Sequence, residues 1–265
     1  MITLIFATVF AGMGPAESPL MTMLVERVSQ ETAFVIESRT DRPDSSNCDI
    51  VLRRESDLAS IKFNTQKSRS LDIATKSWIA GLISATGTNP TTFSGLPLGH
   101  NVHKADGRGG MGFTSRAGLY TVQISISAYQ SLPGNPPTFS IDDRESDQQL
   151  IEGLTRFALA AANGLDSHVA EPLNVAGTQV STVTGTAGGR LANLRQYCQA
   201  KGVTVDIDSR ASKATFTFQG RLVTIPLAAT KISAGQTWIE SDDISILRAG
   251  EWFVSYAALQ SATQT

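Results

Sequence analysis

The sequence predicts an α+β fold in two parts, an N-terminal antiparallel sheet with two amphipathic helices followed by a small β-rich C-terminal module with short helices. Apolar residues alternate with polar ones over residues 118–129, as in an antiparallel strand that is covered on one face. Two other stretches, 70–86 and 146–163, repeat apolar residues every three or four positions, as amphipathic helices do. Short strand patterns separated by tight-turn residues occur in 203–227 and again in 244–254. Because strands and helices do not alternate regularly, parallel βαβ units are not expected.

The first part opens with a short predicted helix and three strands. Ser18 and Pro19 suit the N-cap and the first helical position, and the apolar residues that follow lie on one side of a helix: Leu20, Met23, Leu24 and Val28. Three stretches rich in β-branched or alternating apolar residues are predicted to be strands: 32–38, 48–53 and 58–63. We expect the last two to form a hairpin and the polar residues 39–47 to form a loop.

Each of the two amphipathic helices has its own start and stop residues. Ser70 is the expected N-cap of the first helix and Gly87 its end, with a stripe formed by Leu71, Ala74, Trp78, Leu82 and Ala85. Ser146 and Gln149 fit a capping box for the second helix, which Gly164 is expected to end. Its apolar stripe consists of Leu150, Leu154, Phe157, Ala158 and Ala161.

The domain organisation follows from these elements. Residues 1–16 are expected to be a signal peptide, 17–170 an α+β domain, and 188–265 a C-terminal module. Residues 171–187 are rich in Gly, Ser and Thr and are predicted to be a linker, although a short strand also fits 179–183.

The C-terminal module is predicted to begin with a short helix and a strand. Lys201-Gly202 is a good helix end, and the apolar face of the helix before it consists of Leu191, Leu194 and Cys198. Residues 203–207 then alternate as a strand, and residues 209–211 turn the chain.

Two hairpins and a last helix complete the module. In each hairpin the strands flank a two-residue turn with a glycine, which readily takes a positive φ: 214–218 with 222–227 across Gln219-Gly220, and 244–247 with 251–254 across Ala249-Gly250. Ser255 is the expected N-cap of a final short helix that contains Ala258 and Leu259.

Residues 188–262 carry a recognisable order of elements. Residues 194–202 match a helix that ends in glycine, 203–206 a V-x-V-D strand, 213–227 a strand hairpin, and 250–259 a closing hairpin and helix. This order resembles the copper amine oxidase N-terminal-like (stalk) domain family, which occurs in many bacterial envelope proteins. The prolines of that family's two Val-Pro pairs are absent, since Ala192-Asn193 and Ser255 stand in their places.

The resemblance implies an exported, non-catalytic module that anchors, spaces or mediates contacts. Despite the family's name, the module is not the copper site of the oxidase, and 188–262 contains no histidine that could bind copper. Residues 17–170 resemble no family that we can name.

The N-terminus bears on the cell compartment. Residues 2–13 form an apolar run of about the length of a signal-peptide core, and the small residues Gly14, Pro15 and Ala16 follow it. The run is too short to span a bilayer as a helix. Because no Lys or Arg precedes it, a buried N-terminal strand is the alternative. We favour a signal peptide, and hence an extracytoplasmic protein that is secreted or associated with the cell envelope.

Cys48 and Cys198 allow two interpretations. In an exported chain they could form a disulfide that ties the two parts together and closes a loop of roughly 150 residues. Alternatively both are buried thiols, because Cys198 lies on the apolar side of a predicted helix, where a thiol behaves as a small hydrophobe. We favour two buried thiols.

Few residues have the pattern of a metal or phosphate site. His100 and His103 are closely spaced and Asp106 is near them, but zinc needs three or four protein ligands and no HExxH pattern is present. Surface histidines are therefore the favoured interpretation, and His168 has no evident partner. The glycine-rich residues 107–112 lack the Lys-Ser/Thr of a P-loop and are better explained as turns.

The acidic pairs do not predict catalysis either. Asp142-Asp143 and Asp242-Asp243 are adjacent in sequence, whereas glycoside hydrolysis needs two carboxylates that face each other across a cleft. Helix-cap or turn roles are favoured for them. Asp206 and Asp208 offer too few oxygen ligands for calcium and are expected to bond within a turn. We therefore expect no catalytic residue, no cofactor-binding residue, no metal ligand and no cofactor.

Composition narrows the partners that we expect. The formal net charge is −2 and the 22 Lys and Arg residues are scattered, which argues against nucleic acid. We expect no stable membrane span, and a cell-wall component or an envelope protein as partner. The predicted function is a non-catalytic extracytoplasmic binding or scaffold protein of a bacterial cell envelope. The alternatives are an accessory or degenerate domain of an amidase-type cell-wall hydrolase, and a self-associating subunit of a surface structure.

Overall fold

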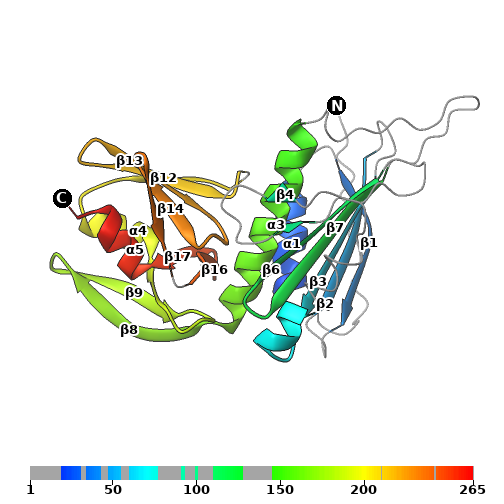
Figure 1. Cartoon of the computed structure of the whole chain (residues 1–265), viewed down its shortest axis with the longest axis horizontal. Helices are drawn as coiled ribbons and strands as arrows, with labels where there is room; N and C mark the ends of the chain where they lie inside the picture. The colour runs from blue at the N-terminus through cyan, green and yellow to red at the C-terminus, as the bar shows by residue number, and fades with distance from the viewer. Residues whose placement is uncertain are drawn as a thin grey trace, which may run out of the picture.

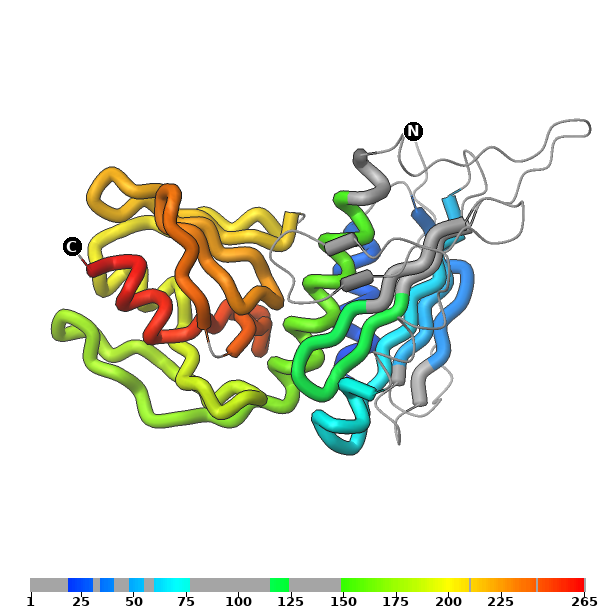
Figure 2. The backbone as a smooth tube through the Cα atoms, viewed as in Figure 1, coloured from blue at the N-terminus to red at the C-terminus, as the bar shows by residue number. Residues whose placement is uncertain are grey.

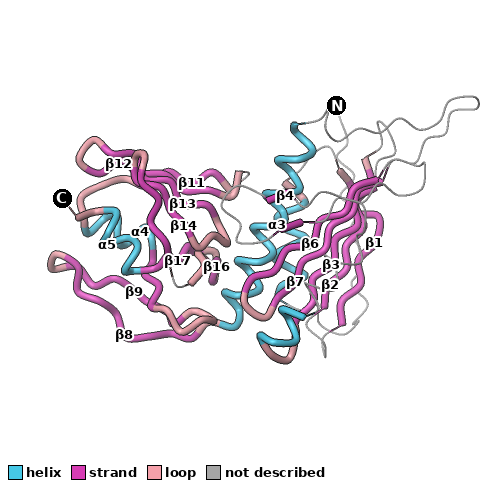
Figure 3. The backbone as a smooth tube through the Cα atoms, in the orientation of Figure 1, coloured by secondary structure: helices cyan, strands magenta, loops and turns pink. Residues whose placement is uncertain are grey.

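Antiparallel sheets dominate the structure (Figure 1). A computed structural model of the chain describes residues 19–30, 34–42, 47–54, 60–76, 91–92, 99–100, 110–127, 145–209, 211–241 and 243–264. Within these residues the strands form three five-stranded sheets and one two-stranded sheet. The predicted α+β class, with a two-helix N-terminal sheet and a small β-rich module, is wrong, because the described chain is mostly antiparallel β-sheet. Figure 3 shows strands in both halves of the molecule.

The first sheet occupies one side of the molecule and has the strand order β1-β2-β3-β7-β6. Its strands are β1 Val35–Arg42, β2 Asn47–Arg53, β3 Ser60–Lys67, β6 Gly110–Ala117 and β7 Tyr120–Ser127. The helices α1 (Pro19–Val28) and α3 (Glu145–Asp166) lie over one face of this sheet (Figure 1). The expected hairpin of 48–53 with 58–63 is present as β2–β3, and the strand expected within 118–129 is present as β7.

Other predictions for the first part are met only in part. Residues 39–42 of the predicted loop belong to β1, and the glycine-rich residues 110–112 belong to β6. Residues 71–76 are helical, as predicted, and the remainder of that predicted helix lies outside the described residues. A short pair of strands, β4 (Thr91–Thr92) and β5 (Gly99–His100), completes this half.

The helix α3 is buried on nearly all sides, unlike the helix with a single apolar stripe predicted for 146–163. All six residues from Ala158 to Asn163 have 0% exposure. Because consecutive residues point in different directions around a helix, α3 must have packing partners all round. These partners are β6 and β7 of the first sheet, α1, and β16 (Ile246–Arg248) of the second half. Figure 2 shows α3 lying between the first sheet and the C-terminal half.

Gly164 lies inside α3, although the sequence predicts it as the helix end. A Cβ atom at Gly164 would lie 1.9 Å from the carbonyl oxygen of Leu247, which no side chain could tolerate. The glycine therefore lets the backbone of α3 approach the backbone of β16.

The predicted linker, 171–187, is part of a sheet. Most of it forms the hairpin of β8 (His168–Val175) and β9 (Thr178–Thr184). This hairpin belongs to the second sheet, whose order is β16-β17-β10-β9-β8 and whose further strands are β10 Arg190–Asn193 and β17 Glu251–Ser255. Most side chains of β8 are exposed. A strand exposed on both faces lacks apolar alternation, which is why its sequence is typical of a linker.

The third sheet has the order β11-β12-β13-β14-β15. Its strands are β11 Val205–Asp208, β12 Lys213–Phe218, β13 Arg221–Pro226, β14 Lys231–Ala234 and β15 Thr237–Glu240. The hairpin across Gln219-Gly220 is confirmed, with φ of 49° and 78° at the two turn residues. The hairpin across Ala249-Gly250 is confirmed as well. The strands β14 and β15 have no counterpart among the predicted elements.

Two short helices pack against the sheets of the second half. The helix α4 (Leu194–Ala200) begins at Leu194, because the residues before it, predicted as helix, form β10 instead. The helix α5 (Tyr256–Ala262) has Ser255 as its N-cap, as predicted. The rings of Tyr197 and Tyr256 meet edge to face with their centroids 6.2 Å apart. Buried apolar side chains from both halves of the molecule form one connected core.

Candidate functional site

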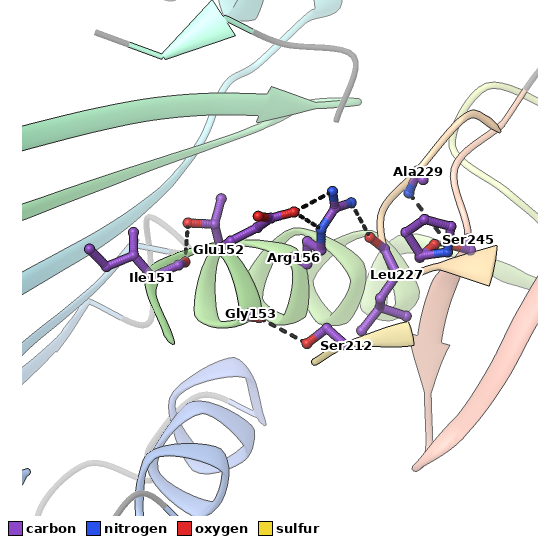
Figure 4. A network of polar contacts seen from close by, with 10 residues as sticks. Ile151, Glu152, Gly153, Arg156, Ser212, Leu227, Ala229 and Ser245 are labelled. Atoms are coloured by element: carbon purple, nitrogen blue, oxygen red, sulfur yellow. Dashed lines mark hydrogen bonds and ion pairs between the residues drawn. The ribbon is translucent and has the colours of Figure 1, made fainter. Parts of the chain in front are cut away.

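Polar contacts join α3 to the second half of the molecule. Three are hydrogen bonds to a backbone carbonyl: Arg156 Nη1 to Leu227 O at 3.1 Å, Ser212 Oγ to Gly153 O at 3.0 Å, and Arg248 Nη1 to Gly164 O at 3.2 Å. Another joins two side chains, since Thr186 Oγ1 donates to Asn163 Oδ1 at 2.9 Å. Figure 4 shows the first two close together on α3, where Leu227 N–H also donates to Ser212 O at 2.8 Å. These contacts hold the helix against the second half at separate points along its length.

Arg156 is the most deeply buried charge in this junction. Its side chain is 3% exposed, and both Nε and Nη2 donate to Oε1 of Glu152, one turn earlier on α3, at 3.0 Å and 2.7 Å. Burial lowers the pKa of Arg156 from its usual value, and the charge of Glu152 opposes that shift. The ion pair therefore compensates for a cation placed between the two halves.

Two hollows lie beside these contacts. The first, here called the lateral hollow, has a volume of about 610 Å³ and is lined by Gln149, Leu150, Glu152, Gly153, Asp208, Ala211 and Lys213. The second, here called the central hollow, has a volume of about 390 Å³. The turn that contains Ser212 contributes to both, since Asp208, Ala211 and Lys213 line the lateral hollow and Ser209 lines the central one.

The central hollow is formed by elements from both halves. Its lining comes from α1, α3, α4, the ends of β11 and β13, and the β16–β17 hairpin: Met23, Glu26, Arg27, Gln30, Phe157, Arg195, Ile207, Ser209, Leu227, Leu247, Gly250 and Trp252. On α1, Glu26 and Arg27 lie three and four positions after Met23, and residues at that spacing lie on one side of a helix. The opposite side of α1 is buried in the core through Leu20, Leu24 and Val28.

The lining of the central hollow combines apolar and charged side chains. Trp252, Leu247 and Leu227 are buried apolar side chains. Two guanidinium groups also line the hollow, since Arg27 is 3% exposed and Arg195 is exposed. The recess thus has about as much polar as apolar surface, and its place between two halves of a protein is a usual one for small-molecule sites.

The polar groups of the central hollow are suited to binding. Arginine stays protonated and offers several donors in a fixed plane, so it recognises carboxylates and phosphates without exchanging protons. Within the described lining, Glu26 carries the one carboxylate. The lining also contains the hydroxyl of Ser209, and no contact within the described residues pairs that hydroxyl with Glu26 or with a histidine or lysine, as a nucleophilic set would require.

Comparisons with known proteins add no evidence about this hollow. No family model, curated protein or solved structure matches the chain. The resemblance of 188–262 to the copper amine oxidase N-terminal-like family therefore stays a prediction.

The histidines and the aspartates of 106–143, which the sequence does not favour as ligands, lie in separate elements or outside the described residues. His100 lies in β5 and His168 begins β8, while His103, Asp106, Asp142 and Asp143 lie outside the described residues. No group of three or more His, Cys, Asp or Glu side chains suited to a metal ion occurs within the described part of the chain. No helix in that part is long and apolar enough to cross a membrane.

Asp208 and Asp243 have structural hydrogen bonds. Asp208 Oδ1 accepts from the backbone N–H of Ala211 at 2.8 Å, which confirms the turn role predicted for Asp208. Asp243 is 4% exposed, and its Oδ2 accepts from the N–H of Ala187 at 3.0 Å. Asp242 lies outside the described residues.

The two cysteines are buried and are not joined in a disulfide. Cys48 lies in β2 and Cys198 in α4. Burial raises the pKa of Cys198 to about 12, so its thiol is protonated and unreactive at neutral pH. The favoured interpretation of two buried thiols agrees with these positions.

Sequence reasoning missed the residues of the central hollow. Arg27, Phe157 and Trp252 come from three separate elements, and each belongs to an ordinary helical or strand pattern. Only the folded chain places them together. The single local signal is Arg27, a charge next to the apolar face of a short helix.

Proposed function

We propose that the protein is a non-catalytic binding protein of a bacterial cell envelope, and that the central hollow is its binding site. The observation that carries the proposal is this hollow of about 390 Å³ between the two halves, with apolar side chains at its floor and guanidinium groups beside them. Its volume falls within the range of roughly 300–1,000 Å³ that is usual for small-molecule pockets.

The envelope location rests on the sequence. The apolar run at residues 2–13, followed by small residues, supports export. The resemblance of 188–262 to a module of envelope proteins supports the same location. Buried thiols are compatible with either compartment, and they carry no weight here.

Binding can be tested with the native protein and a variant in which the hollow is filled. Met23→Trp adds a large side chain at the half-buried edge of the hollow. Both proteins are incubated with an extract of host envelope, separated from free small molecules and weighed by native mass spectrometry. We expect an added mass on the wild type that Met23→Trp lacks, at an unchanged thermal unfolding midpoint. A wild type that carries no added mass contradicts the binding function.

Export has a separate test. Fractionation of the host and sequencing of the mature N-terminus by mass spectrometry are expected to find the chain outside the cytosol, without residues 1–16. A cytosolic protein that retains Met1 would contradict the envelope assignment while leaving the hollow as a binding site.

A self-associating surface subunit is the second candidate, and one observation favours it. The strand β15 lies at the edge of the third sheet and carries Trp238, which is 57% exposed. Edge strands with exposed apolar side chains are prone to pair with other copies. Sedimentation of the wild type and of Trp238→Ser over a range of concentrations tests this candidate, which requires an oligomer that the variant weakens.

A further inference from the structure

We infer that the central hollow binds a small organic anion that carries an apolar body. The inference rests on the proposed binding function and specifies its ligand. Two cations, Arg27 and Arg195, and one anion, Glu26, are the charged groups in the described lining. The lining therefore has a formal charge of +1, which favours an anion with a single charge.

The two guanidinium groups lie at different depths. Arg27, on α1, is 3% exposed, whereas Arg195, on α4, is exposed. A charge in buried surroundings attracts an opposite charge more strongly than one in water does. Arg27 is thus expected to meet the anionic group inside the hollow, and Arg195 to attract it at the mouth. Planar guanidinium groups bind carboxylate and phosphate oxygens in pairs, which suits either headgroup.

The rest of the lining fits an apolar body. Trp252, Leu247 and Leu227 are at most 8% exposed, and the half-buried Phe157, Ile207 and Met23 complete the apolar wall. At roughly 30 Å³ for each water in the liquid, the hollow has room for about a dozen water-sized groups. A chain or ring system of about that size, ending in one acid group, matches both the volume and the charge.

Removing the charge of Glu26 tests whether the ligand is an anion. It lies one residue before Arg27 on α1 and is exposed at the rim. A carboxylate at the mouth repels a second carboxylate, so removing its charge is expected to strengthen the binding of an anion. A purely structural role for Glu26 would not give an increase in affinity.

Isothermal titration calorimetry of the full chain with three ten-carbon probes tests the inference. Decanoate, decanol and decyltrimethylammonium differ in charge and share the same apolar tail. We expect decanoate to bind about tenfold more tightly than decanol, and the ammonium probe to bind most weakly. Arg195→Gln is expected to weaken decanoate about fivefold without changing decanol, and Glu26→Gln to strengthen decanoate about threefold.

Arg53→Gln is the matched control, since Arg53 is an exposed arginine on β2 of the first sheet, 3.5 Å from Glu37. It is expected to bind all three probes as the wild type does. Equal affinity for decanoate and decanol, insensitivity of decanoate to Arg195→Gln, or no binding of decanoate overturns the inference. An added mass that Met23→Trp abolishes would still uphold the binding function in that case, so the two proposals fail separately.

Discussion

The two sides of α3 are packed in different ways. Toward the first sheet the helix lies along β6 and β7, where Asn163 Nδ2 donates to Ala117 O at 3.2 Å and Lys67 Nζ lies 2.8 Å from Asp166 Oδ1. Toward the second half it approaches the backbone of β16 closely at Gly164 and is held elsewhere by hydrogen bonds, with hollows beside them. Contact at separate points leaves room for a ligand between them. The helix therefore belongs to the core of one half and forms a wall of the site with the other.

The largest expected effect comes from the backbone contact at Gly164. In a free helix, Gly164→Ala would stabilise the chain by about 1 kcal/mol through helix propensity. In this structure the added Cβ would lie 1.9 Å from Leu247 O, so α3 and β16 would have to separate. We expect a loss of about 3 kcal/mol in the free energy of unfolding, measured by urea denaturation.

The sign of the Gly164→Ala effect decides whether α3 and β16 are in close contact. A stabilised variant would show that α3 does not press on β16, and the close approach of the two backbones at Gly164 would be refuted. Gly188→Ala serves as the control. An added Cβ at Gly188 has no neighbour within 4 Å, so the substitution costs only the backbone strain of a φ of 89°. That penalty is about 1–2 kcal/mol for a residue with a side chain.

Arg156 carries the next largest effect. Arg156→Met removes the donor to Leu227 O and leaves the Glu152 carboxylate without its buried cation. We expect the free energy of unfolding to fall by about 2 kcal/mol, because a carbonyl and a part-buried charge lose their partners.

A matched pair on another helical segment gives the control for Arg156. Lys76 Nζ lies 2.7 Å from Asp72 Oδ2 at the same i,i+4 spacing, but both side chains are at least 67% exposed. Lys76→Met is expected to change the free energy of unfolding by less than about 0.5 kcal/mol. Equal effects of the two substitutions would mean that burial between the halves does not matter, and that the junction is no stronger than a surface ion pair.

The local elements of the second half were predictable because their signals are local. Gln219-Gly220 and Ala249-Gly250 specify two-residue turns, and Ser255 specifies a helix start within a few residues. The same kind of signal, Ala176-Gly177, marks the β8–β9 turn with positive φ at both residues. A short strand fits 179–183, but the hairpin is not predicted because β8 is largely exposed and lacks apolar alternation.

The role of α3 and the central hollow could not be predicted in the same way. A stripe at helical spacing was evident in 146–163, but the uncharged run of 157–164 shows only that all sides are buried and not what covers them. The hollow draws on elements that lie up to about 230 residues apart, so its composition depends on packing between distant segments. The charges, the spacing of apolar residues and the turn residues in the sequence do not indicate how these distant segments pack.

The smallest expected effect concerns the interior of the second half. This interior is apolar, whereas the junction with α3 contains polar contacts. Burial raises the pKa of Cys198 from 9.0 to about 12, so the unfolded chain loses its thiol proton at a lower pH than the folded chain does. The stabilising contribution of the neutral thiol is complete below about pH 9 and is lost as the pH rises from there toward 12. Burial also raises the pKa of Tyr197, which acts in the same direction. Between about pH 8 and 10 we expect the wild type to lose about 1 kcal/mol more than Cys198→Ala in the free energy of unfolding. Parallel pH profiles for the two proteins would show that water reaches this interior, and the contrast with the junction would then disappear.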